Sequence, residues 1–146
     1  MLTNDNMYKL LPFQIPKFWE AIKQATVAKV DSKNPQFYWN RLLQDLLSDK
    51  RQCFIGINDE RILLRVLIIS IRGDEETGEK YLSIESYYSS EALSMTLWVK
   101  TIGILKQLAT VEGCSSISFI SSDKSMRELS ILNGFHEDSI DLVLEL

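Results

Sequence analysis

The last quarter of the chain constrains the fold most, because four short signals follow one another there with little room for loops. A long helical pattern with an apolar stripe ends at Gly113, and the alternating segment Ser115–Ser121 then predicts a strand. Asp123 is a typical helix N-cap residue, and Gly134 is typical of the position just after a helix end. The segment Ile140–Leu146 predicts a final strand. This order of helix, strand, short helix and strand predicts a fold that mixes helices with a sheet.

Upstream of this region, the hydrophobic pattern predicts further strands and helices. The segment Arg61–Arg72 is apolar on both faces of a strand, so we expect it in the interior of its sheet. The acidic loop Gly73–Lys80 joins it to the alternating segment Tyr81–Tyr88, as in a hairpin. Ser89 or Ser90 is expected to cap the next helix. The remaining predicted elements are a strand at Met7–Leu11, helices at Lys17–Val30 and Gln36–Leu47, a strand at Cys53–Ile57 and a long helix at Glu91–Val111.

Composition narrows the classes of function. The chain has 146 residues, the size of one domain (residues 1–146), and its formal net charge of −4 gives no basic surplus for binding nucleic acid. The start of the chain lacks the layout of a signal peptide, and the longest apolar run, Ile62–Ile71, is too short to span a bilayer. We therefore expect a cytoplasmic protein with no nucleic-acid or membrane partner. Cys53 and Cys114 are expected to be reduced, and a single histidine, His136, gives no basis for a metal site.

The predicted order of elements resembles that of the GNAT acyltransferase fold over essentially the whole chain. Members of that family often carry an Asn, a small residue, a Tyr and a Gly-Phe pair at fixed spacing after the fifth strand. Aligned on Gly134-Phe135, the first three positions hold Asp123, Met126 and Ser130 here, so only the Gly-Phe pair is kept. The resemblance implies an α/β (α+β) fold: one GNAT-like domain with a mixed, mostly antiparallel sheet of six or seven strands flanked by helices.

The segment that would bind the cofactor departs from the family pattern. GNAT enzymes hold the pyrophosphate of acyl-CoA on backbone N–H groups at the start of the long helix, usually in a loop that carries glycines and a basic residue. The corresponding residues 88–94 contain neither, and Glu91 falls in the expected first helical turn, where a carboxylate would repel a pyrophosphate. We therefore expect no cofactor. If the protein does use acetyl-CoA, the resemblance assigns the binding to Ser89, Ser90, Ala92 and Leu93.

The residues that would carry the chemistry also differ. Ser130 takes the position of the tyrosine that protonates the departing CoA thiolate in the family, and a serine hydroxyl is a far weaker acid. Glu85 lies where some GNAT enzymes place a general base that takes a proton from the substrate amine. The alternative for Glu85 is an ordinary hydrogen-bonded carboxylate of the sheet. Glu85 and Ser130 are thus the catalytic candidates only if the protein is an enzyme.

These departures favour a degenerate GNAT-like domain that acts as a non-catalytic protein-interaction or structural module. The chain is also similar in pattern to the small GNAT-like proteins of tailed bacteriophages, which suggests a virion or assembly protein. The alternative is a divergent N-acyltransferase that depends on acyl-CoA, and a third hypothesis is a partner subunit or antitoxin-like inhibitor. The long helix carries more apolar surface than one sheet face covers, so we expect a protein partner or a homo-oligomer to contact Val99, Ile104 and Leu108.

Overall fold

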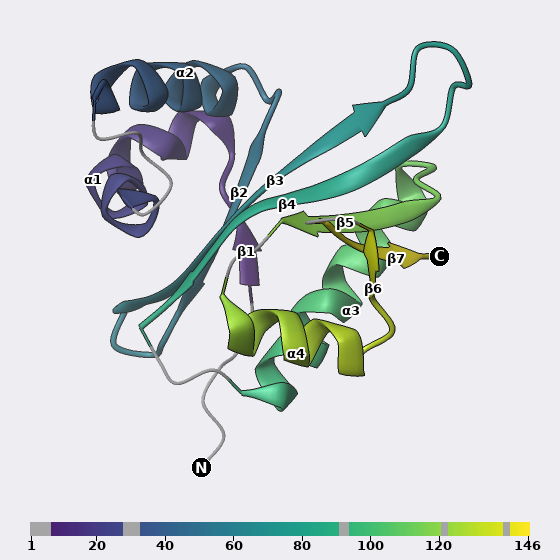
Figure 1. Ribbon diagram of the computed structural model, residues 1–146. Coiled ribbons are helices and arrows are strands. Elements are labelled where there is room, and N and C mark those ends of the chain that lie inside the picture. Colours follow the sequence, from purple (N-terminus) through teal and green to yellow (C-terminus); the bar gives the residue numbers. More distant parts are fainter. Residues whose placement is uncertain (1–6, 28–32, 91–93, 121–122, 139–140) are drawn as a thin grey trace. The chain divides into compact units, whose positions relative to one another are not determined.

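The computed structural model describes residues 7–27, 33–90, 94–120, 123–138 and 141–146 (Figure 1). Residues with a known preference for helix starts stand at the starts of its first two α-helices. Pro16 lies in the first turn of α1, and the Asn34 side chain accepts a hydrogen bond from the Phe37 amide at the start of α2. The elements in chain order are β1 Met7–Lys9, η1 Pro12–Gln14, α1 Ile15–Ala25, α2 Pro35–Leu47, β2 Gln52–Ile57, β3 Leu63–Gly73, β4 Lys80–Ser89, α3 Met95–Val111, β5 Ser116–Ile120, α4 Lys124–Leu132, β6 His136–Asp138 and β7 Asp141–Glu145.

The described strands form one seven-stranded sheet in the order β1-β2-β3-β4-β5-β7-β6. The pairs β1–β2, β2–β3, β5–β7 and β6–β7 are antiparallel, whereas β4 and β5 are parallel. The prediction of a mixed, mostly antiparallel sheet with flanking helices is therefore confirmed. The strand predicted at Arg61–Arg72 is β3, and it lies in the interior of the sheet between β2 and β4, as its two apolar faces require.

The chain divides into two compact units, and β3 and β4 each pass through both of them (Figure 1). Unit 1 comprises residues 1–69 and 86–91, and unit 2 comprises residues 70–85 and 92–146. Neither unit is a continuous stretch of the chain, because the hairpin of residues 70–85 belongs to unit 2.

The core of unit 1 lies where α1 and α2 pack on β2 and β3. Helical spacing places Ile15 and Ile22 of α1 and Leu42 and Leu46 of α2 on the buried faces of their helices. The buried apolar residues of this cluster are Leu10, Ile15, Ile22, Leu42, Leu46, Cys53, Ile55, Val66 and Ile68.

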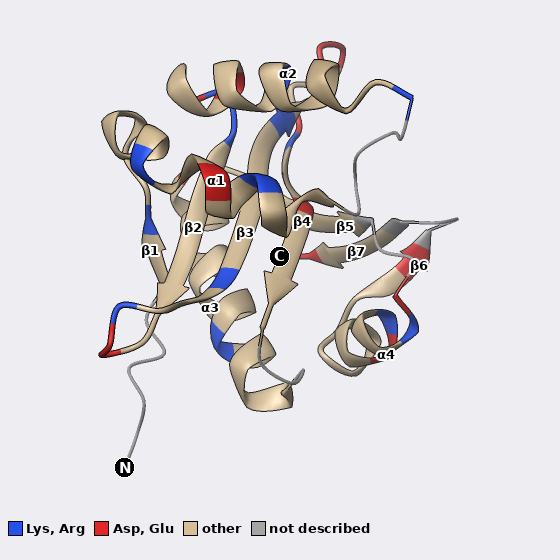
Figure 2. Cartoon of the chain, turned by 90° about the vertical axis from the view of Figure 1, so that its left-hand side faces the viewer, with Lys and Arg blue, Asp and Glu red and all other residues tan. Residues whose placement is uncertain are grey.

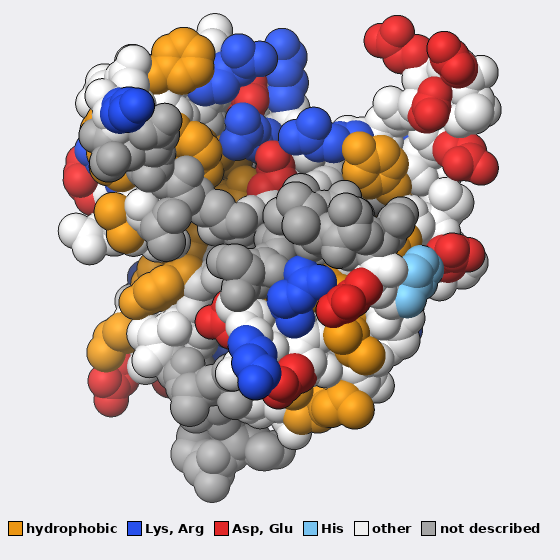
Figure 3. Space-filling view, viewed as in Figure 1, with side chains coloured by type: hydrophobic (Ala, Val, Ile, Leu, Met, Phe, Trp, Pro, Cys, Tyr) orange, Lys and Arg blue, Asp and Glu red, His pale blue; other side chains and the backbone are white. Residues whose placement is uncertain are grey.

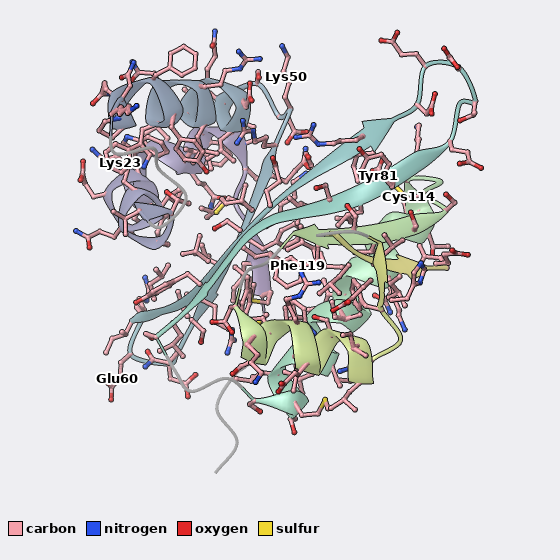
Figure 4. The ribbon with its side chains drawn as sticks, viewed as in Figure 1. Lys23, Lys50, Glu60, Tyr81, Cys114 and Phe119 are labelled. Carbon is pink, nitrogen blue, oxygen red and sulfur yellow. The ribbon has the colours of Figure 1, made fainter. Side chains whose placement is uncertain are left out.

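Unit 2 is built around α3, which packs on β5. Trp98 of α3 is fully buried, and its ring centroid lies 5.5 Å from that of Phe119 on β5 (Figure 4 marks Phe119). One stripe of this helix is exposed: Thr96, Lys100, Gly103, Gln107 and Thr110. The helix buries the opposite set, Trp98, Thr101, Ile102, Leu105 and Ala109.

The start of α3 differs from the prediction. Its first residue is Met95, and its cap is Ser94, whose side chain accepts a hydrogen bond from the Leu97 amide at 3.4 Å. The predicted first residue, Glu91, lies outside the described residues. The two predicted cap residues lie at the end of a strand instead. Ser89 is the last residue of β4, and the Ser90 amide donates to the Leu64 carbonyl at 2.8 Å. Neither Ser89 nor Ser90 caps α3, because Ser89 still belongs to β4 and a hydrogen bond to a residue distant in the sequence holds Ser90.

Charged residues are distributed over helices and strands of both units (Figure 2). Within the part of the chain that the structure describes, no cluster of three His, Cys, Asp or Glu side chains could hold a metal ion. The described helices are also all too short or too polar to cross a membrane.

Candidate functional site

The parallel pairing of β4 with β5 covers only part of β4. Its register runs from Tyr81 opposite Ser116 to Ile84 opposite Phe119, although β4 continues to Ser89 (Figure 4 marks Tyr81 and Phe119). Glu85 is the first residue of β4 beyond this pairing.

Glu85 is held by an arginine of the neighbouring strand. Its Oε1 accepts a hydrogen bond from Arg72 Nη2 at 3.1 Å, and the same contact is an ion pair. Arg72 Nε in turn donates to Ser70 Oγ at 3.2 Å, and Ser70 is buried. The Glu85 side chain is 20% exposed and that of Arg72 is 53% exposed. The arrangement gives a carboxylate with a fixed orientation that solvent still reaches.

Ser130 is fully buried near the end of α4. Its carbonyl accepts hydrogen bonds from the Asn133 amide at 2.9 Å and the Phe135 amide at 3.1 Å, which close the helix before Gly134. Its hydroxyl has no hydrogen-bond partner among the described residues. The structure thus places Ser130 in the packing at the helix end, with no surface through which it could touch a bound thiolate.

Two of the four predicted cofactor residues, Ala92 and Leu93, lie outside the described residues. The other two, Ser89 and Ser90, lie at the end of β4. Ser89 is half-buried, and both the amide and the hydroxyl of Ser90 donate to the Leu64 carbonyl, at 2.8 and 3.3 Å. The Ser90 N–H group is therefore already engaged within the fold, and it is not an open donor for a phosphate.

The first turn of α3 supplies other donors. The first N–H groups of a helix have no partner within it, and here these belong to Met95 and Thr96, both exposed. No acidic residue lies in this turn, so the repulsion expected from a carboxylate in the first helical turn does not arise there. The helix N-terminus at Ser94–Leu97 can accept an anionic group such as a phosphate.

The three predicted interface residues remain at least partly exposed. Val99 is 47% exposed, and Ile104 and Leu108 are half-buried. Hydrophobic side chains are also exposed near the end of α4 (Figure 3), where Ile131 and Leu132 are 44% and 73% exposed. A contact of this surface with a partner stays a prediction.

A further feature is a shallow cavity of about 250 Å³ in unit 1, beside α1 and α2. Trp39 forms one wall, with the Lys23 ammonium 5.5 Å from the centre of its ring (Figure 4 marks Lys23). The Trp39 indole donates to Thr26 Oγ1 at 3.3 Å, and Lys23 also pairs with Glu20 at 3.4 Å. No pattern in the sequence predicts this cavity, because it depends on how two helices pack.

Comparison with solved structures shows that the chain has the fold of GNAT acetyltransferases. A predicted acetyltransferase from Clostridium acetobutylicum, solved with acetyl-CoA, matches with a TM-score of 0.71 at 12% identity over 92% of this chain and 91% of that chain. The aminoglycoside N-acetyltransferase AAC(6')-Iy in complex with CoA matches with a TM-score of 0.65 at 15% identity, over 95% and 92%.

A ribosomal-protein-alanine N-acetyltransferase from Brucella melitensis biovar Abortus 2308 matches with a TM-score of 0.67 at 16% identity, over 92% of this chain and 94% of that chain. No protein-family model matches the sequence, and no curated protein is significantly similar to it. The likeness therefore concerns the fold, over nearly the full length of each neighbour.

Proposed function

We propose that the protein is an N-acyltransferase that depends on acyl-CoA. The observation that carries this proposal is the likeness of fold to acetyltransferases, two of them solved with CoA or acetyl-CoA, over more than nine-tenths of both chains. A fold alone does not fix a function. The proposal has a second support in the chain itself, because the Glu85 carboxylate lies one residue beyond the end of the β4–β5 pairing and keeps a solvent-exposed part.

In the proposed reaction, Glu85 takes one proton from the ammonium group of the acceptor. The free amine then attacks the carbonyl carbon of the thioester, the new C–N bond forms, and the C–S bond breaks to release CoA as a thiolate. The proton lost by the new amide nitrogen balances the one that the thiolate gains. Because Ser130 is fully buried, we propose that solvent water, and not a side chain of α4, delivers that proton.

The described residues fit the acyl-CoA donor in part. Met95 and Thr96 are exposed residues at the start of a 17-residue helix, and their N–H groups are suited to hold one of its phosphates. The donor would bring the activated acyl group, and the chain would bind and orient it.

Calorimetric titration with acetyl-CoA tests the proposal. We expect a dissociation constant below about 100 μM, which corresponds to about −5.5 kcal/mol. Coenzyme A without the acetyl group should also bind, because it carries the same phosphates that the start of α3 is proposed to hold. Absence of heat for both ligands at protein concentrations near 100 μM would contradict the proposal.

A second candidate function is a non-catalytic interaction module. Two observations favour it: the Ser90 amide is engaged with Leu64, and Ser130 is buried where an acid would be needed. The partly exposed apolar residues of α3 would then serve a partner. The similarity to the small GNAT-like proteins of tailed bacteriophages, and the virion or assembly role that it suggests, stay predictions from the sequence. A protein that binds neither acetyl-CoA nor CoA would favour this second function.

A further inference from the structure

We infer that Arg72 is a positioning residue that holds the reacting oxygen of Glu85, and that Ser70 holds Arg72; this inference rests on the proposed function. The three side chains form one chain of hydrogen bonds: Arg72 Nε donates to Ser70 Oγ at 3.2 Å, and Arg72 Nη2 donates to Glu85 Oε1 at 3.1 Å. All three residues belong to unit 2.

The geometry of the guanidinium group explains why two contacts suffice. The group is planar, and its N–H groups point in fixed directions. Fixing Nε through Ser70 and Nη2 through Glu85 therefore fixes its plane. Ser70 is only 5% exposed, so the anchor at the Nε end is itself held by packing. A lysine could supply the charge but not the second contact.

The contact is made to Oε1, and the other carboxylate oxygen of Glu85, Oε2, is buried. An acceptor that approaches from solvent would therefore meet the carboxylate at Oε1. A carboxylate oxygen carries two lone pairs, so Oε1 can accept from Arg72 and still take a proton from an amine. Arg72 thus orients the atom to which the proton moves, and does not itself touch the reacting groups.

A purely structural role for this pair predicts different behaviour. An ion pair with a half-exposed arginine contributes little to folding stability. If the pair only joins two strands, its loss should leave kcat unchanged in folded protein. If it orients a base, its loss should lower kcat and leave the binding of acetyl-CoA unchanged, because a small displacement of a catalytic group is enough to slow the reaction.

The test uses the full chain with acetyl-CoA and three amine acceptors: kanamycin, spermidine and a peptide that begins with alanine. Released CoA thiol gives kcat and KM, and calorimetry gives the affinity for acetyl-CoA. We expect Arg72→Ala to lower kcat by about 10-fold to 100-fold with unchanged acetyl-CoA affinity. Arg72→Lys should retain more activity than Arg72→Ala, and Ser70→Ala should lower kcat less than either. Low concentrations of guanidinium chloride should restore part of the kcat of Arg72→Ala.

The decisive measurement is the double variant Arg72→Ala with Glu85→Gln. If Arg72 acts through Glu85, the double variant should have the same kcat as Glu85→Gln alone. Arg127→Ala is a matched control, because Arg127 forms an ion pair of similar length, 3.2 Å, with Glu137 in the same unit. This control should leave kcat unchanged. Should Arg72→Ala fail to fold, the same comparison of kcat, alone and combined with Glu85→Gln, is made with Arg72→Lys and Ser70→Ala.

The outcomes separate this inference from the proposed function. If the wild-type protein does not bind acetyl-CoA, the proposed function fails and the inference fails with it. If it binds acetyl-CoA but transfers the acetyl group to none of the amines, the transfer step of the proposed function fails and the inference fails with it. If transfer occurs but Arg72→Ala keeps its kcat, or if the losses of the two single variants multiply in the double variant, the inference alone is overturned.

Discussion

Gly56 lies directly opposite Arg65 in the antiparallel pairing of β2 with β3. Arg65 is only 1% exposed, and its guanidinium group lies over the backbone of the glycine. A Cβ atom at position 56 would lie 2.7 Å from both Nε and Nη2 of Arg65. Because the arginine is enclosed on all sides, its side chain has little room to move away. Glycine is required at position 56 by the neighbouring side chain and not by its own backbone angles.

We therefore expect Gly56→Ala to destabilise the protein by about 1–3 kcal/mol, the usual cost of overpacking a closed site. Gly103→Ala is the control, because Gly103 is exposed on α3 and a Cβ there would meet no heavy atom within 4 Å. This control should stabilise the protein by up to about 1 kcal/mol, since alanine favours a helix over glycine. Urea unfolding of the two variants measures the difference, and equal stabilities would contradict the account.

A second prediction at this scale compares the two catalytic candidates. If the protein transfers acetyl groups, Glu85→Gln should lower kcat by about 100-fold or more, because the amide cannot take a proton. Ser130→Ala should leave kcat nearly unchanged, because the Ser130 hydroxyl is fully buried. Initial rates with acetyl-CoA and an amine acceptor measure both variants. A collapse of activity in Ser130→Ala with full activity in Glu85→Gln would reverse the two roles.

At the scale of the element, the signals that could be read from the sequence are the local ones. Asp123 caps α4 by accepting a hydrogen bond from the Met126 amide at 3.0 Å, and Gly134 adopts a positive φ of 97° just after the helix, both as predicted. The start of α3 was misplaced because the bond from Ser90 to Leu64 joins residues that are distant in the sequence. A local pattern carries no information on such a bond.

The cap of α4 gives a prediction for one element. Asp123→Ala should destabilise the protein by about 1 kcal/mol, because the Met126 amide loses its acceptor. Asp123→Asn should retain most of the stability, since the amide oxygen of asparagine can accept the same hydrogen bond. Thermal unfolding of the two variants separates them. An equal loss in both would mean that the charge of Asp123, and not its hydrogen bond, supports the helix.

At the scale of the whole molecule, the order of elements and the class of sheet could be predicted, because both follow from hydrophobic periodicity along the chain. The contacts of the candidate site could not. Glu85 was recognised by its position in β4, but its partner Arg72 comes from another strand, and only the register of two strands brings them together. The burial of Ser130 likewise depends on how α4 packs, and the spacing of residues in the sequence does not predict that packing.

The stability of the folded chain should depend on a buried thiol at high pH. Burial raises the pKa of Cys53 from its ordinary value of 9.0 to about 12. Between these values the unfolded chain loses a proton that the folded chain keeps, so stability is full below pH 9 and falls as the pH rises toward 12. From pH 8 to pH 10 the wild type should lose about 1 kcal/mol more than Cys53→Ala. Urea unfolding of both proteins at the two pH values measures this, and equal losses would contradict it.

The division of the two units has a consequence for biosynthesis. Unit 1 needs residues 86–91, which leave the ribosome only after the hairpin of residues 70–85. At about 5–20 residues per second, the nascent chain spends roughly 1–4 s with the first part of unit 1 made and its last part missing. During that time β3 lacks its neighbour β4, so the edge of the incomplete sheet exposes unpaired N–H and C=O groups, with which other chains can pair. Translation speed through this hairpin should therefore influence how much of the newly made protein aggregates.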